Sequence, residues 1–254
     1  FHNAEDQLRG EAATLQFFSS GQFSNPMVLR IAGLAYQKGF GGHFHNDNSL
    51  AIFRDIPGVI LGVPSNGSSA VKMFRHALKL AYEEKRIVVF IEPIALYMTK
   101  DLHEKNDGQW SFNYPKHSEE ITLGQTIRYG TSKVLTILSY GNGLYLSLRA
   151  KKEIEKKIDE TIQIIDLCWL SNIKINNLLK QIGNCSSVLI VDECRKSGCY
   201  GEGLMVDLLK ENKIGLKVDL HAADNSFISL GEGSTSTLPS KRSIIEAAYR
   251  LLGV

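Results

Sequence analysis

Long apolar runs, cysteine pairs and an excess of one charge are all missing from these 254 residues. No hydrophobic stretch approaches the roughly 20 residues that a membrane-spanning helix needs, so we expect no membrane partner. The 29 basic and 27 acidic side chains leave a formal charge of +2. That balance gives no reason to propose nucleic acid as a partner. The four cysteines show no CxxC spacing, which favours a reducing compartment over a disulfide framework.

The common nucleophile and phosphate-binding motifs are missing too. The sequence contains no GxSxG, no GxxxxGK[ST] and no GxGxxG that follows a strand. Residues 198–203 are rich in glycine and precede a helix, where free amides could bind an anion. Because Glu202 would repel a phosphate there, we interpret this run as a tight strand-to-helix turn.

Apolar strand-like runs alternate with helix-like segments along most of the chain. Fully buried strands between helices are typical of parallel sheets that are covered on both faces. The sequence therefore predicts an α/β fold with mainly parallel sheets. The predicted strands are 26–33, 58–64, 87–91, 134–140, 162–170, 188–192 and 218–221. The predicted helices are 4–18, 50–56, 68–84 (with Ser65 as its cap), 143–157, 172–181, 200–211 and 240–252.

A polar stretch interrupts this alternation near the middle of the chain. Residues 99–125 carry many charges, the turn sequence Asn106-Asp107-Gly108, and Pro115. A chain of this length can form one large domain or two smaller ones. We therefore predict two α/β units, residues 1–115 and 116–254, joined through this stretch.

The segment at residues 39–47 is the first candidate for chemistry. It follows a predicted buried strand and carries three glycines within four positions, then His43 and His45. Glycine lets the backbone turn sharply and approach a ligand, and loops after such strands often carry functional groups. The spacing resembles the HxHxDH ligands of metallo-hydrolases, although Asn48 replaces the last histidine. A simple Gly-rich turn with hydrogen-bonded histidines is the alternative, and the low number of candidate ligands favours it over a metal site.

Several short motifs stand in a specific order over essentially the whole chain. They are residues 20–23, 26–30, 41–45, 56–58, 63–65, 90–97, 139–141, 165–167, 191–193 and 197–201. Their order and spacing resemble one family, the beta subunit of the thiamine-diphosphate-dependent decarboxylating component of 2-oxo acid dehydrogenase complexes, which act mainly on pyruvate or branched-chain 2-oxo acids. The tail at residues 224–231 resembles the variant in which alpha and beta parts are fused.

The resemblance implies a fold, an activity and one catalytic residue. Residues 1–115 would be part of a transketolase-like pyrimidine-binding domain whose N-terminal part lies upstream of Phe1. Residues 116–254 would be the transketolase C-terminal-like domain. The intact enzyme would decarboxylate a 2-oxo acid and pass the acyl group to lipoyl on an acyltransferase core. His45 matches the family's active-site histidine, which handles the acyl intermediate and its transfer, whereas His43 matches a position that varies.

The resemblance also implies cofactors and partners. Thiamine diphosphate with magnesium would be held by the upstream segment and by the alpha part, so we assign no cofactor or metal ligand within these residues. The 254 residues alone are expected to bind little cofactor and to be inactive. The implied partners are an alpha part, the lipoyl acyltransferase core and a second beta part in a homodimer. The implied compartment is the bacterial cytoplasm or the mitochondrial matrix.

Two departures from the family bear on substrate and potassium. Asn46-Asp47-Asn48 replaces the family's Ser-Gln-Ser after the histidine, which leaves the substrate preference open. Residues 83–86 lack the Asp and Pro of the family's potassium segment, so we assign no potassium site. Two alternative functions also stay open. Another transketolase-like enzyme, such as transketolase or deoxyxylulose phosphate synthase, is one alternative, although residues 90–97 favour the dehydrogenases. A non-catalytic module for dimerisation and assembly is the other.

Overall fold

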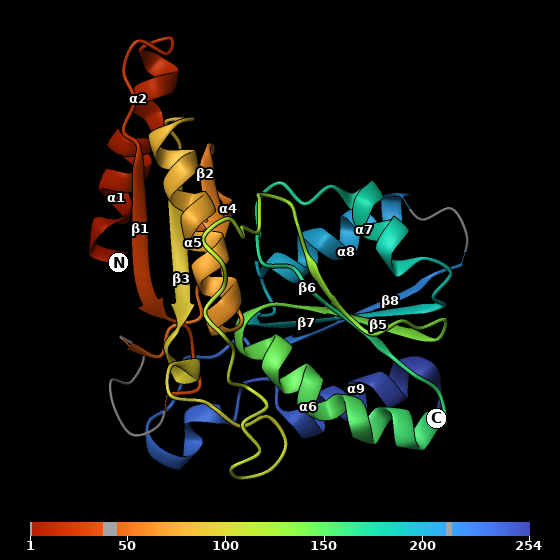
Figure 1. Ribbon diagram of the computed structural model, residues 1–254. Helices are drawn as coiled ribbons and strands as arrows, with labels where there is room; N and C mark the ends of the chain where they lie inside the picture. Colours follow the sequence, from red (N-terminus) through yellow and green to blue (C-terminus); the bar gives the residue numbers. More distant parts are fainter. Residues whose placement is uncertain (1, 38–44, 212–214) are drawn as a thin grey trace.

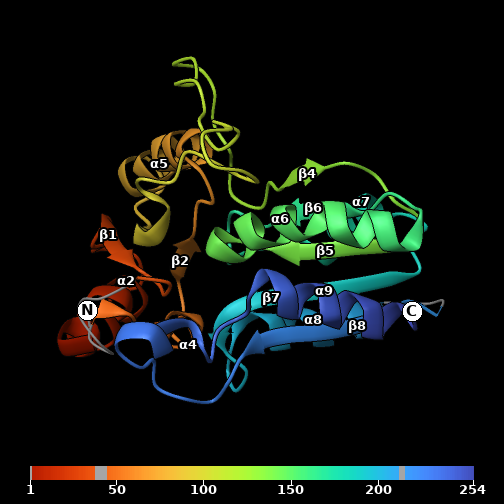
Figure 2. The same ribbon diagram turned by 90° about the horizontal axis from the view of Figure 1, so that it is seen from below.

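The computed structural model describes residues 2–37, 45–211 and 215–254 of the chain. A three-stranded and a five-stranded sheet lie side by side, each with helices packed against it (Figures 1 and 2). Among the described residues, all pairs of named strands but one are parallel. The α/β fold with mainly parallel sheets, expected from the sequence, is confirmed.

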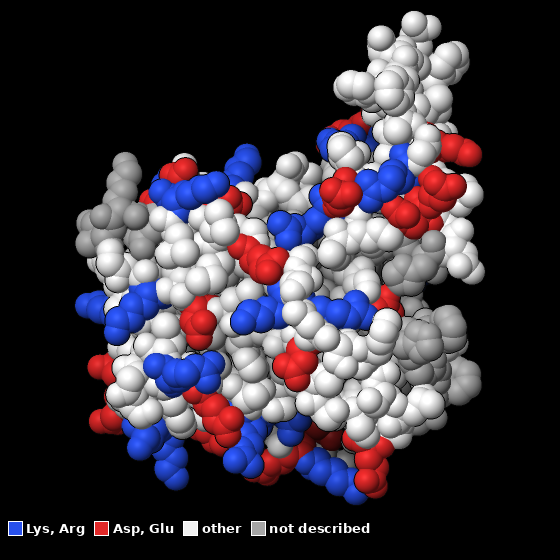
Figure 3. Space-filling model, turned by 180° about the vertical axis from the view of Figure 1, so that it is seen from behind, with Lys and Arg blue, Asp and Glu red and all other residues white. Residues whose placement is uncertain are grey.

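A helical segment opens the chain, as predicted for residues 4–18. It ends where Ser20 and Gly21 adopt positive φ angles of 53° and 81°, and the Gly21 amide donates to the Gln16 carbonyl at 2.8 Å. Residues 12–29 hold no charged side chain, and Figure 3 shows an uncharged projection where this segment lies. The successive elements are a 3₁₀ turn (His2–Ala4), α1 (Glu5–Gln7), a π-helical turn (Leu8–Ala12) and α2 (Ala13–Phe18).

The three-stranded sheet has the order β1-β3-β2, with all strands parallel. Its helix α5 buries Met73, Ala77 and Leu80 against the sheet residues Val88 and Phe90. These helix positions recur at intervals of three and four, which places them on one face. The elements are β1 (Met27–Gly33), α4 (Ala51–Arg54), β2 (Val59–Gly62), α5 (Gly67–Tyr82), β3 (Ile87–Pro93) and the 3₁₀ turn η3 (Ile94–Leu96).

The five-stranded sheet has the order β4-β6-β5-β7-β8. The short edge strand β4, which the sequence did not predict, pairs antiparallel with β6, and the other pairs are parallel. The strands are β4 (Ile127–Tyr129), β5 (Leu135–Ser139), β6 (Gln163–Asp166), β7 (Ser187–Arg195) and β8 (Lys217–Ala223). The helices are α6 (Gly141–Ile158), α7 (Ile175–Ile182), α8 (Tyr200–Glu211), the 3₁₀ turn η4 (Gly231–Thr235) and α9 (Lys241–Leu252).

The helices cover both faces of this sheet (Figure 1). α6 and α9 lie on one face, and α7 and α8 lie on the other. Side chains of β7 alternate accordingly: Leu189 and Val191 pack with α6 and α9, whereas Val188 and Ile190 pack with α7 and α8. A strand buried on both faces needs apolar side chains at every position, which explains the continuous run in the sequence.

The two sheets share one apolar cluster. Trp169, after β6, is fully buried and forms an isolated antiparallel bridge with Gly62 of β2. The Leu170 amide donates to the Leu61 carbonyl at 2.8 Å. Buried residues from the three-stranded sheet and from the five-stranded sheet belong to the same cluster, for example Leu61 and Leu167. The halves are therefore joined by packing as well as by the chain.

The helix cap predicted at Ser65 is wrong. Asn66 is the N-cap of α5, and its side chain accepts a hydrogen bond from the Ser69 amide at 2.9 Å. The Ser69 hydroxyl accepts from the Asn66 amide in return, which completes a capping box. Ser65 instead accepts a hydrogen bond from the Gly141 amide at 2.8 Å. The serine thus links the start of α5 to the start of α6.

The polar stretch at residues 99–125 is an ordered connection. The Asp107 carboxylate accepts hydrogen bonds from several backbone amides, including those of Leu102 and His103, at 2.7–3.0 Å. Trp110 is buried against the cluster around α6, and Ile121 is buried against Trp169. The stretch contains no helix or strand, as the sequence predicted, but it packs against both sheets.

The four cysteines form no disulfide, in agreement with the lack of paired spacing in the sequence. Cys168 and Cys185 are buried and free, as are Cys194 and Cys199. Burial raises the pKa of the Cys168 and Cys194 thiols well above the ordinary value, so these thiols stay protonated. Within the described ranges, no helix is both long enough and apolar enough to span a bilayer.

Candidate active site

The strands β1 and β3 end together, with Gly33 opposite Pro93. The chain leaves β1 through Leu34 and Tyr36, whose φ angles of 66° and 67° are left-handed. For residues other than glycine this conformation costs about 1–3 kcal/mol each, and it persists only where surrounding contacts impose it. One such contact runs from the Tyr36 hydroxyl to the Pro239 carbonyl, at 2.8 Å. The strained exit from β1 marks this edge of the sheet as a candidate site.

Gln37 and Asn46 pair on either side of the undescribed residues 38–44. The Gln37 amide donates to Asn46 Oδ1 at 3.0 Å, and Asn46 Nδ2 donates to the Gln37 carbonyl at 2.9 Å. Gln37 Nε2 also donates to the carbonyl of His45 at 2.7 Å. The backbone of His45 is therefore anchored to the end of β1. His43, by contrast, lies outside the described residues, as does most of the glycine-rich run.

His45 lies at a cavity of about 290 Å³ beside the carboxyl end of β1. Ile31, Ile91 and Phe53 form an apolar wall, and Asp47 contributes a carboxylate. His45 itself is exposed. Loops at the carboxyl ends of parallel strands are the usual place for chemistry in such folds. The position fits the expectation for His45, and its catalytic role stays a prediction.

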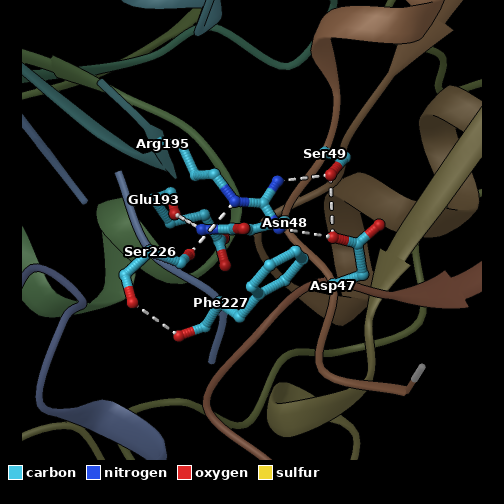
Figure 4. Close-up of polar contacts among 7 residues, drawn as sticks. All are labelled: Asp47, Asn48, Ser49, Glu193, Arg195, Ser226 and Phe227. Atoms are coloured by element: carbon cyan, nitrogen blue, oxygen red, sulfur yellow. Dashed lines mark hydrogen bonds and ion pairs between the residues drawn. The ribbon is translucent and has the colours of Figure 1, made fainter. Parts of the chain in front are cut away.

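Arg195, at the end of β7, contacts the segment that follows His45 (Figure 4). Its guanidinium donates to Asp47 Oδ1 at 3.1 Å and to the Ser49 hydroxyl. Ser49 donates to the same Asp47 oxygen at 2.8 Å. Arg195 Nε donates to the Ser226 carbonyl at 3.1 Å, and its guanidinium lies 5.9 Å from the centre of the Phe227 ring. One side chain thus joins the segment after His45 to the segment after β8.

Glu193, two residues earlier on β7, makes a second connection. Its backbone carbonyl accepts a hydrogen bond from Asn48 Nδ2 at 2.7 Å (Figure 4). Its fully buried carboxylate accepts from the Ala35 amide at 3.3 Å and from Asn142 Nδ2 at 3.0 Å. Burial raises the pKa of Glu193 to about 7, although the hydrogen bonds from Asn142 and Ala35 lower it. Both flanks of the undescribed residues 38–44 are therefore tied to β7.

The end of β7 is itself held rigidly. Asp192 Oδ1 accepts hydrogen bonds from the Tyr140 hydroxyl at 2.5 Å and from the Cys194 amide at 2.8 Å. Its other oxygen accepts from the Gly201 amide at 2.8 Å. A carboxylate with three donors fixes the backbone on both sides of Glu193. The strand end is consequently a firm support for the His45 segment.

Metal ligands do not gather around His45 within the part of the chain that the structure describes. No group of three His, Cys, Asp or Glu side chains there could hold a metal ion. The ring of His76 packs edge-on against Trp169, and His221 hydrogen-bonds to Ser243. The described residues therefore lack the ligands that the alternative of a metallo-hydrolase requires.

The same test applies to thiamine diphosphate with magnesium. The cavity at His45 offers an apolar wall and one imidazole, and its described lining holds no lysine or arginine for a diphosphate. The described residues present no ligand cluster for the ion that accompanies a diphosphate. Among the residues that the structure describes, we therefore assign none to cofactor binding.

A larger cavity, of about 620 Å³, lies between the start of α5 and the polar connection. Glu92, Tyr97 and Trp110 are among its lining residues. Glu92 forms a salt bridge with Arg30 at 2.6 Å and accepts a hydrogen bond from the Tyr97 hydroxyl at 2.7 Å. Burial, followed by the hydrogen bond to Glu92, raises the pKa of Tyr97 to about 12. Glu92 is thus already occupied by partners from this chain.

The glycine-rich run at residues 198–203 is a tight turn, as predicted. The Gly198 amide donates to the Glu202 carboxylate at 2.7 Å, and Gly198 has a φ of 82°. Glu202 thus occupies the place that an anion would take at the start of α8.

Comparison with known proteins defines the class to which this architecture belongs. Residues 124–221 match the family model described as "Transketolase, C-terminal domain". A solved structure described as "Split gene transketolase, inactive beta4 tetramer" superposes with a TM-score of 0.64 and 17% identity, over 89% of this chain and 67% of that one. The fold is transketolase-like.

Within that class, the resemblance noted in the sequence is confirmed. The chain is 24% identical to the pyruvate dehydrogenase E1 component subunit beta of Staphylococcus epidermidis, over 97% of this chain and 71% of that one. The corresponding subunit of Bacillus subtilis is 22% identical over the same shares. The mitochondrial 2-oxoisovalerate dehydrogenase subunit beta of Dictyostelium discoideum is 27% identical, over 77% of this chain and 49% of that one.

The sequence did not identify Glu193 or Arg195 as site residues. Arg195 lies 148 positions from Asp47, so no local spacing could join them. The available signal was weak: a strand of apolar residues ends in Asp192, Glu193 and Arg195, and charged groups in that position often face a site.

Proposed function

We propose that this chain is the beta part of a thiamine-diphosphate-dependent 2-oxo acid dehydrogenase. With an alpha part, it would decarboxylate a 2-oxo acid and transfer the acyl group to lipoyl on an acyltransferase core. One observation carries the proposal: similarity to E1 beta subunits extends over 97% of the chain. The position of His45 beside the cavity at the end of β1 supports it.

The two halves would have different roles. Residues 1–115 would belong to the pyrimidine-binding domain, and residues 116–254 would form the C-terminal domain. When bound, thiamine diphosphate supplies the nucleophilic carbon and the electron sink for decarboxylation. The alpha part would hold the diphosphate and its magnesium. The enzyme would work in the bacterial cytoplasm or the mitochondrial matrix.

His45 is proposed as the catalytic residue of this chain. Its imidazole reaches solvent at the cavity, beside a wall of apolar side chains. An imidazole there can act as a general acid or base as the acyl group moves to lipoyl. The apolar wall formed by Ile31, Ile91 and Phe53 would exclude water from that side.

The test is reductive acylation of a lipoyl domain by the chain assembled with its alpha part, with pyruvate and 2-oxoisovalerate as substrates. We expect acylation that requires thiamine diphosphate, and a loss of about 10²–10⁴-fold in His45→Ala. His117→Ala is the matched control, because His117 is an exposed histidine of the polar connection. Full acylation by His45→Ala would contradict the catalytic assignment. Absence of acylation from every 2-oxo acid would contradict the function.

A pairing role for the chain is the second candidate. The similar solved structure is described as an inactive beta4 tetramer of a split-gene transketolase. A module for dimerisation and assembly would form such pairs and show no acylation in the same assay. We propose that beta parts pair in either case, because homodimers are the commonest assembly of identical chains.

A further inference from the structure

The segment that carries His45 is held by contacts from the other half of the molecule. Gln37 fixes the His45 carbonyl, and Asn48 donates to the Glu193 carbonyl. Arg195 binds Asp47 and Ser49 through their side chains. Glu193 and Arg195 both lie at the end of β7, whereas Gln37 lies in the same half of the chain as His45. The position of His45 therefore depends on residues about 150 positions away.

Arg195 is better placed than an ordinary surface cation. Its side chain is 26% exposed and that of Asp47 is 20% exposed, so water screens this ion pair only in part. The guanidinium also donates to Ser49 and to the Ser226 carbonyl (Figure 4). The planar fork of arginine can bind several acceptors at once, whereas lysine is a single point charge. The contacts fix Asp47 and Ser49 in direction as well as in distance.

Hydrogen bonds fix the end of β7, on which Arg195 lies. Asp192 is hydrogen-bonded to Tyr140, Cys194 and Gly201, and Glu193 to Asn142. A functional side chain needs such a second layer to stay within about 0.5 Å of its working geometry. The residues at the end of β7 supply that second layer for His45, which lies on the segment after β1.

We propose that Arg195 is a positioning residue for His45, acting through Asp47 and Ser49. The inference rests on the proposed catalytic role of His45 for its effect on rate. The geometric part stands without that role: removing the guanidinium releases the segment after His45 from β7. A displacement of about 1 Å at a catalytic group can lower a rate by on the order of 10²-fold.

Hydrogen exchange in the full chain, assembled with its partners, tests the geometric part. In Arg195→Ala we expect the amides of residues 45–49 to exchange about tenfold faster, because charge-assisted hydrogen bonds are lost. The control is Arg242→Ala, which removes an exposed ion pair with Glu246 on α9. Unchanged exchange at residues 45–49 in Arg195→Ala would overturn the proposal.

Kinetics of lipoyl acylation test the effect on His45. We expect kcat of Arg195→Ala to fall by on the order of 10- to 100-fold, with KM for the 2-oxo acid within about twofold. Arg195→Lys should recover only part of kcat, since it keeps the charge and loses the fork. Two results would overturn the positioning role. One is a rise in KM of Arg195→Ala as large, in fold-change, as the fall in kcat. The other is a wild-type kcat in Arg195→Lys.

Two further outcomes separate the linked claims. If His45→Ala acylates normally while Arg195→Ala still loosens residues 45–49, the anchoring is supported and the catalytic role of His45 fails. If Arg195→Ala does not fold, Ser49→Ala takes its place, because it removes one acceptor and leaves β7 intact. Faster exchange at residues 45–49 in Ser49→Ala would support the proposal, and wild-type exchange would overturn it.

Discussion

The indole of Trp169 covers Gly62 so closely that no side chain fits between them. A Cβ atom at Gly62 would lie 2.8 Å from Cζ3 of Trp169 and 2.9 Å from its Cε3. Real Cβ contacts are essentially never that short. Trp169 is fully buried, so its ring has little room to move. This contact lies where the two sheets meet.

Gly62→Ala should therefore destabilise the protein. Overpacking of a buried site costs about 1–3 kcal/mol, and the loss should appear as a lower midpoint in urea. Gly10→Ala is the control, because a Cβ there meets nothing within 4 Å, and it should be neutral or stabilising by up to about 1 kcal/mol. Equal midpoints for the two variants would show that Trp169 can move aside.

Asn66→Ala should weaken the start of α5. The variant loses the hydrogen bond from the Ser69 amide, and loss of such a cap costs about 1 kcal/mol. The neighbouring variant Ser68→Ala lies within the first turn and should change the free energy of unfolding by less than about 0.5 kcal/mol. Chemical denaturation of both variants decides. An equal effect in the two would argue against the cap at Asn66.

Asp166 should make stability depend on pH. Burial raises its pKa from 3.8 to about 7, although hydrogen bonds such as the one from the Cys168 amide lower it. The unfolded chain then releases this proton at lower pH than the folded protein does. The free energy of unfolding should fall between about pH 4 and pH 7, by up to about 1.4 kcal/mol per pH unit. Above pH 7 this contribution becomes constant.

The variant Asp166→Asn has no titrating carboxyl at this position, so its free energy of unfolding should depend less on pH. Denaturation at several pH values should show about one proton less of pH dependence in the variant. Asp6→Asn changes an exposed carboxyl and should leave the profile unchanged. Parallel profiles for wild type and Asp166→Asn would mean that Asp166 stays ionised in the folded protein.

Self-association should be measurable in solution. If beta parts pair as proposed, sedimentation at micromolar concentration should give a species of twice 28.2 kDa, in equilibrium with the single chain at lower concentration. A permanent interface of this kind buries on the order of 2,000 Å² or more. One species of 28.2 kDa at every concentration would rule the pair out.

Local pattern was sufficient for most of the fold. β7 could be recognised because both of its faces are buried, so residues 188–191 are all apolar. β4 was missed because three residues at a sheet edge, of which Arg128 is exposed, leave no periodic signal. The cap was misplaced because Ser65 and Asn66 are both good caps. The choice between them depends on Gly141, which is 76 positions away.

The sequence predicted one part of the candidate site, the His45 segment, and missed the part on β7. The glycines and two histidines after a predicted strand pointed to the segment, and the family resemblance then selected His45 within it. Arg195 and Glu193 could not be singled out, because their partners lie across the sheet ends and only the folded chain brings them together. Charged residues at a strand end can face solvent or a site, and sequence alone does not separate the two.

The apolar cluster shared by the two sheets has a consequence for a nicked chain. A protease that cut the exposed part of residues 104–109 would break the backbone and leave Leu61 and Leu167 in one apolar cluster. The two pieces would stay together and would separate only in denaturant. Produced separately, each piece would carry an unmatched apolar face and would need the other during folding. A cut in the polar connection would therefore divide the chain in two, while apolar packing would keep the two pieces associated.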